Sequence, residues 1–263
     1  MGLLLRTWLA LAVLFAGTAR GQAPAYSAAG IVNASNYAPG PFAPNSVLSL
    51  FGTNLAYSTQ NLTSDAIVGG ELPNQMAGVG VYVDGSLAPL LYVSPLQINF
   101  LVPVTEVTGA AQVTVVRQGV AGPTVTINLA SAAPQLFDDP NNLGYVLAED
   151  WNLGNAVIAP NAPAQGGNIL ILFATGLGAV TPMTASGEVA EYASPIINAG
   201  SLKVTINGTA LDPSAILYAG LTPGSAGLYQ INLVLPANAG SNPLVQVSIG
   251  DQASAAGRQL AVQ

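Results

Sequence analysis

One stretch of this chain is written twice, and that repeat limits what the chain can fold into. The first copy, residues 90–103, reads LLYVSPLQINFLVP. The second begins ILY at residue 216 and, after an insertion rich in Gly and Pro, continues GLYQINLVLP over residues 227–236. In both copies Gln-Ile-Asn alternates polar and β-branched side chains, the pattern of a strand with one buried face. Two copies of this pattern predict two modules with the same fold.

The segments around the two copies also repeat, and they do so in the same order. Each module has a strand and turn containing Phe, then a strand that enters a hairpin turn, Asp-Gly in the first module and Asn-Gly in the second. Such turns need φ > 0 and favour these residues. The matched segments, first module against second, are 46–55 and 168–178, 80–85 and 202–208, and 111–129 and 244–262.

The composition favours β-structure. Hydrophobic residues make up 51% of the 263 residues and charged residues 6%, against a usual charged fraction of about a quarter. Exposed helices normally carry Glu and Lys on their wet face, so helix should be scarce. We therefore predict an all-β chain of two tandem immunoglobulin-like antiparallel β-sandwiches from an internal duplication, with each repeated strand central in its sheet. Residues 22–131 form the first sandwich and residues 132–263 the junction plus the second. A jelly roll over the whole chain is the alternative that the repeat disfavours.

The first residues are typical of a secretory signal. Arg6 precedes an apolar run, Trp8–Ala16, and a small-x-small site follows, so we predict a signal peptide over residues 1–21, cleaved after Gly21, with Ala23 as the alternative site. The competing interpretation is an uncleaved anchor, but the apolar run is shorter than the roughly 20 residues that span a bilayer. We expect a secreted or cell-surface protein that does not span the membrane after cleavage.

The charge balance excludes nucleic acid as a partner. Two of the five Lys and Arg residues lie in the signal, and the other three, against twelve Asp and Glu, give a net charge of −9. A chain this acidic repels phosphate backbones and has no basic face from which counterions could be released.

Most catalytic chemistry is also excluded by composition. The chain has no His and no Cys, which rules out Ser-His-Asp and Cys-His catalysis and the ordinary zinc and copper sites. The single Lys, Lys203, lies in a predicted strand without a Ser-x-x-Lys motif. A carboxylate pair could still support glycoside hydrolysis. The candidate pairs are Asp138 with Asp139, Glu149 with Asp150, and Glu188 with Glu191.

Two candidate sites lie at or just after the predicted junction. Asp138, Asp139, Asn141 and Asn142 gather the hard oxygen ligands that calcium prefers, although a turn rich in Asp and Asn explains them equally well. Trp151 is the candidate for ligand binding, because an exposed aromatic ring can stack on a sugar. We expect Tyr92, Tyr218 and Tyr229 to be structural, since they lie within the repeated strands.

Five short motifs in this order resemble a known family. They are GIVNA at residue 30, FGTNLA at 51, YVSPLQIN at 92, ATGLG at 174 and GLYQIN at 227. Together they are similar to the Solibacter-type C-terminal repeat domain of secreted acidobacterial proteins, and FGTNL separately resembles the opening of IPT/TIG domains. The resemblance implies tandem immunoglobulin-like sandwiches, export, and attachment to larger surface proteins. It implies no catalytic residues.

These observations favour a non-catalytic protein. The first hypothesis is an extracellular binding or adhesion module that contacts polysaccharide or a surface protein. The second is a structural subunit that self-associates into a fibre or layer when the strand around Ile31, or another exposed edge, pairs with the next chain. The third is a glycoside hydrolase that uses one of the carboxylate pairs. No cofactor other than calcium is expected.

Overall fold

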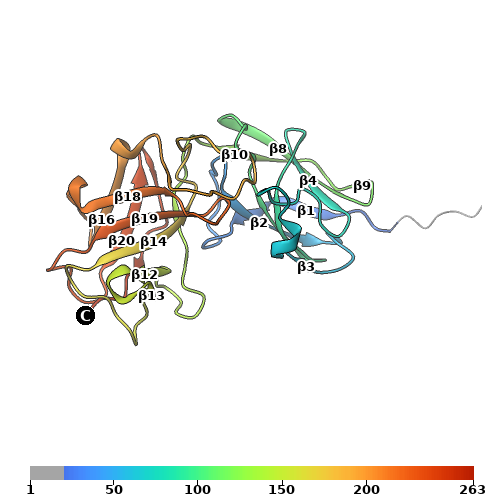
Figure 1. The fold of residues 1–263 in the computed structure, drawn as a ribbon. Helices are drawn as coiled ribbons and strands as arrows, with labels where there is room; N and C mark the ends of the chain where they lie inside the picture. The colour runs from blue at the N-terminus through green and yellow to red at the C-terminus, as the bar shows by residue number, and fades with distance from the viewer. Residues whose placement is uncertain (1–20) are drawn as a thin grey trace, which may run out of the picture.

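The computed structural model describes residues 21–263, and the prediction of an all-β chain is confirmed (Figure 1). The predicted signal peptide lies outside the described residues except for Gly21. Helix is limited, within residues 21–263, to four 3₁₀ turns of three residues each. No described helix is long and apolar enough to cross a membrane.

In the N-terminal half, residues 21–131, the two sheets enclose one apolar core. One sheet has the order β1-β2-β7-β6-β3, and the other β10-β8-β4-β5 with β9 beside β8. Alternate residues point inward, so Leu50 and Ile98 of the first sheet share a core with Val81 and Val113 of the second. The elements are β1 (Ala25–Asn33), β2 (Val47–Thr53), β3 (Gln60–Asn61), η1 (Ser64–Ala66), β4 (Val79–Val83), β5 (Ser86–Leu87), β6 (Leu90–Val93), β7 (Gln97–Leu101), β8 (Gly109–Arg117), β9 (Val120–Ala121) and β10 (Val125–Leu129).

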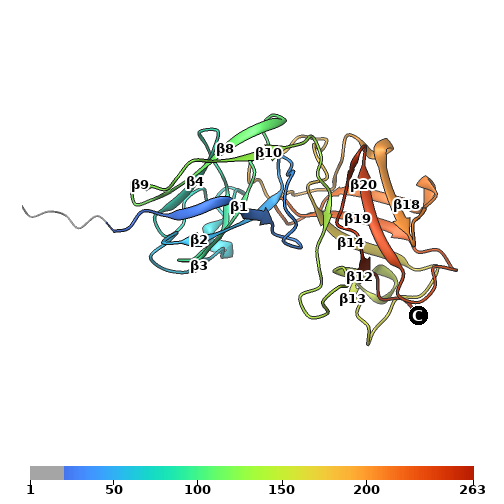
Figure 2. The ribbon, with the colours of Figure 1, turned by 180° about the vertical axis from the view of Figure 1, so that it is seen from behind.

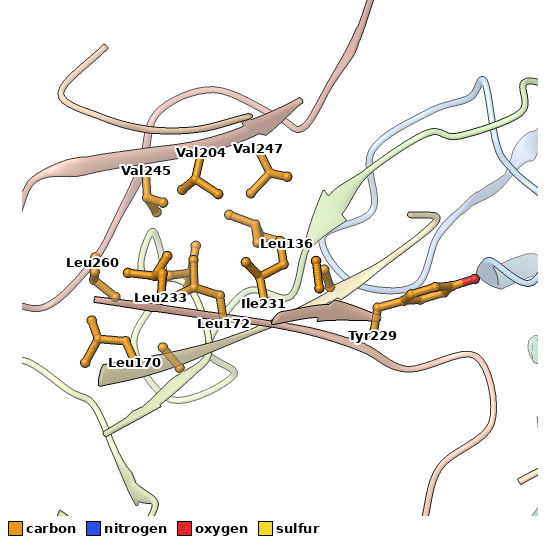
Figure 3. Packing of buried hydrophobic residues seen from close by; sticks show 14 of the residues in the cluster. Leu136, Leu170, Leu172, Val204, Tyr229, Ile231, Leu233, Val245, Val247 and Leu260 are labelled. Carbon is orange, nitrogen blue, oxygen red and sulfur yellow. The ribbon is translucent and has the colours of Figure 1, made fainter. Parts of the chain in front are cut away.

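In the C-terminal half, residues 132–263, the sheets have the orders β13-β12-β14-β19-β18-β15, with β11 beside β14, and β17-β16-β20-β21, with β22 beside β20. Figure 3 shows Val204 and Val247 of one sheet facing Leu172 and Ile231 of the other. The elements are β11 (Gln135–Leu136), β12 (Ala148–Asp150), η2 (Trp151–Leu153), β13 (Ala156–Val157), β14 (Ile169–Thr175), β15 (Ser194–Pro195), η3 (Ala199–Ser201), β16 (Leu202–Ile206), β17 (Thr209–Ala210), η4 (Pro213–Ala215), β18 (Ile216–Leu221), β19 (Tyr229–Val234), β20 (Leu244–Ile249), β21 (Gln252–Ala253) and β22 (Arg258–Gln259).

Each repeated stretch forms a hairpin rather than a single strand. The hairpins are β6–β7 and β18–β19, and β7 and β19 lie inside their sheets as predicted. Both contain a register shift at the same place, which leaves Tyr92 opposite Asn99 and Tyr218 opposite Asn232. The polar residues of Gln-Ile-Asn bond to each other on one face, because residues two apart in a strand are neighbours. The Gln Nε2 to Asn Oδ1 distance is 2.9 Å in the first copy and 3.0 Å in the second.

The predicted hairpin turns are present in both halves. Asp84 and Gly85 have φ of 44° and 86°, and Asn207 and Gly208 have φ of 49° and 78°. Positive φ at both central residues is the geometry for which Asp-Gly and Asn-Gly are suited.

The two halves meet end to end (Figure 2), and Tyr229 is at the centre of the contact. Figure 3 shows its ring leaving the C-terminal core with the hydroxyl pointing toward the N-terminal half. That hydroxyl donates to Gly178 O at 2.7 Å and accepts from Asn45 Nδ2 at 3.3 Å. Nearby, Val47 N donates to Thr175 Oγ1 at 3.0 Å. Burial raises the pKa of Tyr229 to about 12.

A loop contact adds to this junction. Leu72 N donates to Gly187 O at 2.9 Å, and Val189 N donates to Gly70 O at 2.8 Å. The loop around Gly187 therefore pairs with the loop around Gly70 as a short ladder between the halves, beside the contact made by Tyr229.

Candidate functional site

The turn that carries Trp151 is organised by a buried carboxylate. We call residues 150–157, which join β12 to β13 through η2, the Trp151 turn. Asp150 caps η2, is 1% exposed, and accepts Asn152 N on Oδ1 at 2.9 Å and Asn168 Nδ2 on Oδ2 at 2.6 Å. Asp is favoured at this position because its side chain satisfies a free backbone N–H of the turn. Gly154 ends η2 with φ of 69°, a conformation that glycine adopts without strain.

The Trp151 turn presents apolar side chains to solvent. Trp151 is 58% exposed, as expected from the sequence, and Leu153 is 64% exposed. Asn152 ties the turn to the sheet, since its Oδ1 accepts from Ile169 N at 2.7 Å where β14 begins. The indole therefore stands on a support fixed at both ends by hydrogen bonds. A support held in this way does not have to be ordered when a ligand stacks on the ring, which lowers the entropy cost of binding.

Two exposed aromatic rings, those of Tyr37 and Phe51, lie close together on the N-terminal half, where the sequence indicated no site. Tyr37 and Phe51 are 62% and 38% exposed, and their ring centroids are 5.8 Å apart. Leu50 and Ile98, which point into the core, are direct sequence neighbours of Phe51 and Gln97. The alternation along β2 would therefore have placed Phe51 on the outer face. The exposure of Tyr37 could not be predicted from strand alternation, because Tyr37 lies in a loop with φ of 58°.

The predicted calcium ligands come together, but protein donors already use their carboxylates. Asp139 is 2% exposed and accepts Asn141 N at 2.8 Å on Oδ1 and Asn142 Nδ2 at 2.7 Å on Oδ2. Asp138 forms an ion pair with Arg258 Nε. Within residues 21–263 no group of three or more His, Cys, Asp or Glu side chains is placed to hold a metal ion. Calcium binding here stays a prediction.

The calcium cluster lies at the junction, as predicted, and away from the Trp151 turn. Asp138 N donates to Ser35 O of the N-terminal half at 3.0 Å, and the adjacent Phe137 N donates to Phe173 O in β14. The Trp151 turn is attached at Ile169, four residues earlier in β14. Four residues of strand span roughly 13 Å, so the structure does not bring the two predicted sites together.

The carboxylate pairs differ from one another in their surroundings. Glu149 and Asp150 are consecutive in a strand and so point to opposite faces, and both Asp150 oxygens are engaged. Glu188 Oε2 accepts from Ala185 N at 2.6 Å, and Glu191 Oε1 accepts from the Tyr192 hydroxyl at 2.9 Å. The sequence suggested Glu191 as the partner of Glu188. It did not indicate that Glu71 lies opposite Glu188, in an isolated bridge between the halves.

No family model and no curated protein matches the chain. Solved structures with partial likeness include the surface glycan-binding protein PbSGBP-B from Prevotella bryantii, at 14% identity and a TM-score of 0.28, over 83% of this chain and 37% of that one. The Bacteroides ovatus mixed-linkage glucan utilization locus SGBP-B, in complex with a mixed-linkage heptasaccharide, has 11% identity and a TM-score of 0.32, over 84% and 42%. The extracellular region of Plexin A4 has 13% identity and a TM-score of 0.30, over 98% and 19%. The chain thus spans about a fifth to two fifths of these proteins, and we draw no conclusion about function from the likeness.

Proposed function

We propose that this protein is an extracellular binding module that recognises polysaccharide, with Trp151 as the stacking residue. The observation that carries the proposal is an exposed indole on a turn fixed by a buried carboxylate. Asp150 is 1% exposed while its neighbour Trp151 is 58% exposed. Burying a carboxylate costs free energy unless hydrogen bonds compensate. Here those bonds, from Asn152 and Asn168, hold the support of the indole.

The surroundings of Trp151 favour an uncharged sugar polymer. A large ring with an apolar face can cover the C–H face of a sugar. The exposed Asn155 amide offers a donor and an acceptor for hydroxyl groups, and Asn152, whose Oδ1 accepts from Ile169 N, still offers its amide N–H. The chain carries a net charge of −7 and only five basic residues, so an anionic polymer would be repelled. A neutral glucan or mannan is therefore the class that we would test first.

The test is binding of the chain to a panel of neutral polysaccharides by affinity electrophoresis. Trp151→Ala should weaken retardation at least about tenfold, a loss of about 1.4 kcal/mol. Tyr192→Ala is the matched control, since Tyr192 is another exposed aromatic, at 72%, outside the Trp151 turn. Unchanged binding by the Trp151 variant, or equal loss in both variants, would contradict the proposal.

Self-assembly into a fibre through strand edges stays the alternative. Three of the described edges, β1, β13 and β15, are poorly suited to it, whereas the edge strand β10 is regular over five residues. The edge strand β1 has a register break between Tyr26 and Ile31, and the edge strands β13 and β15 have two residues each. Short or irregular edges hinder pairing with another chain. We expect sedimentation velocity to give one species over a wide concentration range, and growth into long species would favour the fibre.

A further inference from the structure

A cavity of about 350 Å³ opens at the junction of the two halves. It lies beside the Tyr229 contact, with Asn45, Val104 and Val107 contributed by the N-terminal half and Met183, Thr184 and Tyr229 by the C-terminal half. Its volume is within the range of roughly 300–1,000 Å³ that is typical of small-molecule sites. Contacts between domains are among the places where such sites occur most often.

The hydrogen bonds around Tyr229 decide how the amide of Asn45 is oriented. A tyrosine hydroxyl has one hydrogen, and that of Tyr229 is donated to Gly178 O at 2.7 Å. Asn45 must therefore donate its Nδ2 to Tyr229, at 3.3 Å, so its Oδ1 is fixed on the other side of the amide. No hydrogen bond among the described residues uses this Oδ1. Asn45 is 6% exposed and lines the cavity, so it offers an acceptor to whatever enters.

Further polar groups line the same space, namely the hydroxyl groups of Thr108, Ser131 and Thr184 and the carboxyl group of Glu106. Thr184 is 7% exposed and lines the cavity with Asn45. Glu106 lies among the lining residues, and desolvation raises the pKa of its carboxyl group above the usual value. The polar side of the cavity therefore combines the free acceptor of Asn45, hydroxyl groups that can donate or accept, and one carboxyl group. It suits a ligand that brings hydrogen-bond donors and disfavours an anion.

Much of the remaining lining is apolar, and part of it is open to solvent. Val107 is 77% exposed and Met183 is 84% exposed. Val104 and Val180 line the cavity with them. A methionine thioether makes favourable contacts with aromatic rings and adapts to their shape. This lining favours a flat apolar body.

We propose that the junction cavity binds a small aromatic molecule with an N–H donor, neutral or cationic, of the indole or aryl-amine class. The ring lies between Met183 and the valines, and its N–H donates to Asn45 Oδ1. The ligand contacts both halves at once. This site is separate from the Trp151 turn and does not depend on polysaccharide binding.

The test uses indole as the probe, titrated into the full chain and followed by ligand-observed NMR and calorimetry. We expect saturable binding with a Kd of about 1 mM or below, as suits a molecule of this size. N-methylindole has no donor and should bind about fivefold more weakly, the effect of one hydrogen bond. Indole-3-acetate should also bind more weakly, because the net negative charge of the chain repels its carboxylate. No saturable binding of indole, or equal binding of indole and N-methylindole, would overturn the proposal.

A pair of matched variants locates the binding. Val107→Asp places a charge on the lining and should weaken indole binding at least about fivefold. Val68→Asp is the control, since Val68 is 76% exposed and is not among the lining residues. Both positions are exposed, so both variants should fold. Asn45→Ala tests the acceptor directly, and if it does not fold, the N-methylindole comparison still decides. Equal affinity in the two Asp variants, or loss of indole binding in Trp151→Ala, would show that indole binds elsewhere.

Discussion

Corresponding ends of the two halves have different environments. In the C-terminal half, Thr175 and Tyr229 are fully buried against the N-terminal half. Their counterparts by sequence alignment are Thr53, which is exposed, and Leu96, which is 61% exposed. The strands that carry them are paired in the same way. The same scaffold therefore ends in a contact in one half and in solvent in the other.

At the opposite ends of the halves, just before β2 and β14 begin, it is the N-terminal half that contacts the other half. Asn45 N donates to Val102 O at 2.8 Å, and its counterpart Gly167 N donates to Leu235 O at 2.8 Å, so the backbones match. Asn45 has an amide that receives Tyr229, whereas Gly167 has no side chain. The neighbour of Gly167, Asn168, is bound to Asp150 of the Trp151 turn. The end that contains Asn45 joins the two halves, and the end that contains Gly167 and Asn168 supports the turn of Trp151.

The strongest test of this comparison is to remove the large side chain at the aligned position in each half. Tyr229→Ala should lower the free energy of unfolding by about 3–5 kcal/mol, because it empties a buried site and leaves Asn45 and Gly178 without their partner. Leu96→Ala should change it by less than about 0.5 kcal/mol. Denaturant unfolding of both variants measures the difference. Similar losses would show that the two ends are equally important.

High pH should weaken the junction. Tyr229 titrates near 10 when unfolded and at about 12 when folded. Its neutral form is therefore favoured by the fold, and the stabilisation is complete below pH 10 and lost as the pH rises through 10 to 12. Two pKa units correspond to about 3 kcal/mol.

The measurement is the free energy of unfolding between pH 9 and pH 12, for the natural chain and for Tyr229→Phe. The decline should be less steep in the variant. Desolvation also raises the pKa of Tyr26 and Tyr218, so some decline with the same sign remains in both proteins. Equal slopes would contradict the assignment to Tyr229.

The aligned threonines give a smaller contrast. Thr175→Val keeps the volume but removes the acceptor of Val47 N, so a buried donor loses its partner at a cost of about 1–3 kcal/mol. Thr53→Val lies at the exposed end and should cost less than about 0.5 kcal/mol. Thermal unfolding of the two variants would show the difference, and a costly change at Thr53 would indicate that this end is also covered.

The smallest effect is expected at the predicted calcium cluster. The side chains of Arg258 and Asp138 are 26% and 25% exposed, so Asp138→Asn should lower the free energy of unfolding by no more than about 1 kcal/mol. Calcium should leave the Tm unchanged, since the carboxylates are already engaged. A calcium-dependent rise in Tm that Asp138→Asn removes would establish the ion site instead.

Much of the fold could be predicted from the sequence because strands and turns are local patterns. The alternation in residues 97–101 and the Asp-Gly and Asn-Gly turns depend only on neighbouring residues. The hairpin within each repeated stretch was less clear, because the apolar run continues through Ser94-Pro95. Exposure of Trp151 was also predicted, since it lies in a polar segment between strands.

The junction could not be predicted in the same way. Asn45 and Tyr229 are separated by 184 positions, and no local pattern indicates that one receives the other. Tyr229 was expected to be structural, and it is, but its partner depends on how two folded halves dock. The same holds for Asp150. From the sequence it was a candidate catalytic carboxylate, whereas in the structure it is buried and caps η2.

The register shift shared by the two hairpins has a consequence for folding. Because Tyr92 with Asn99 and Tyr218 with Asn232 adopt the same pairing, each strand of one hairpin is a credible partner for the complementary strand of the other. While the chain collapses, an exchanged hairpin can form and persist as a kinetic trap. The ends of β7 and β19 differ, with Leu96 before one and Tyr229 at the start of the other, and this difference would penalise the exchange. Tyr229, which joins the folded halves, would then also disfavour wrongly paired strands while the halves fold.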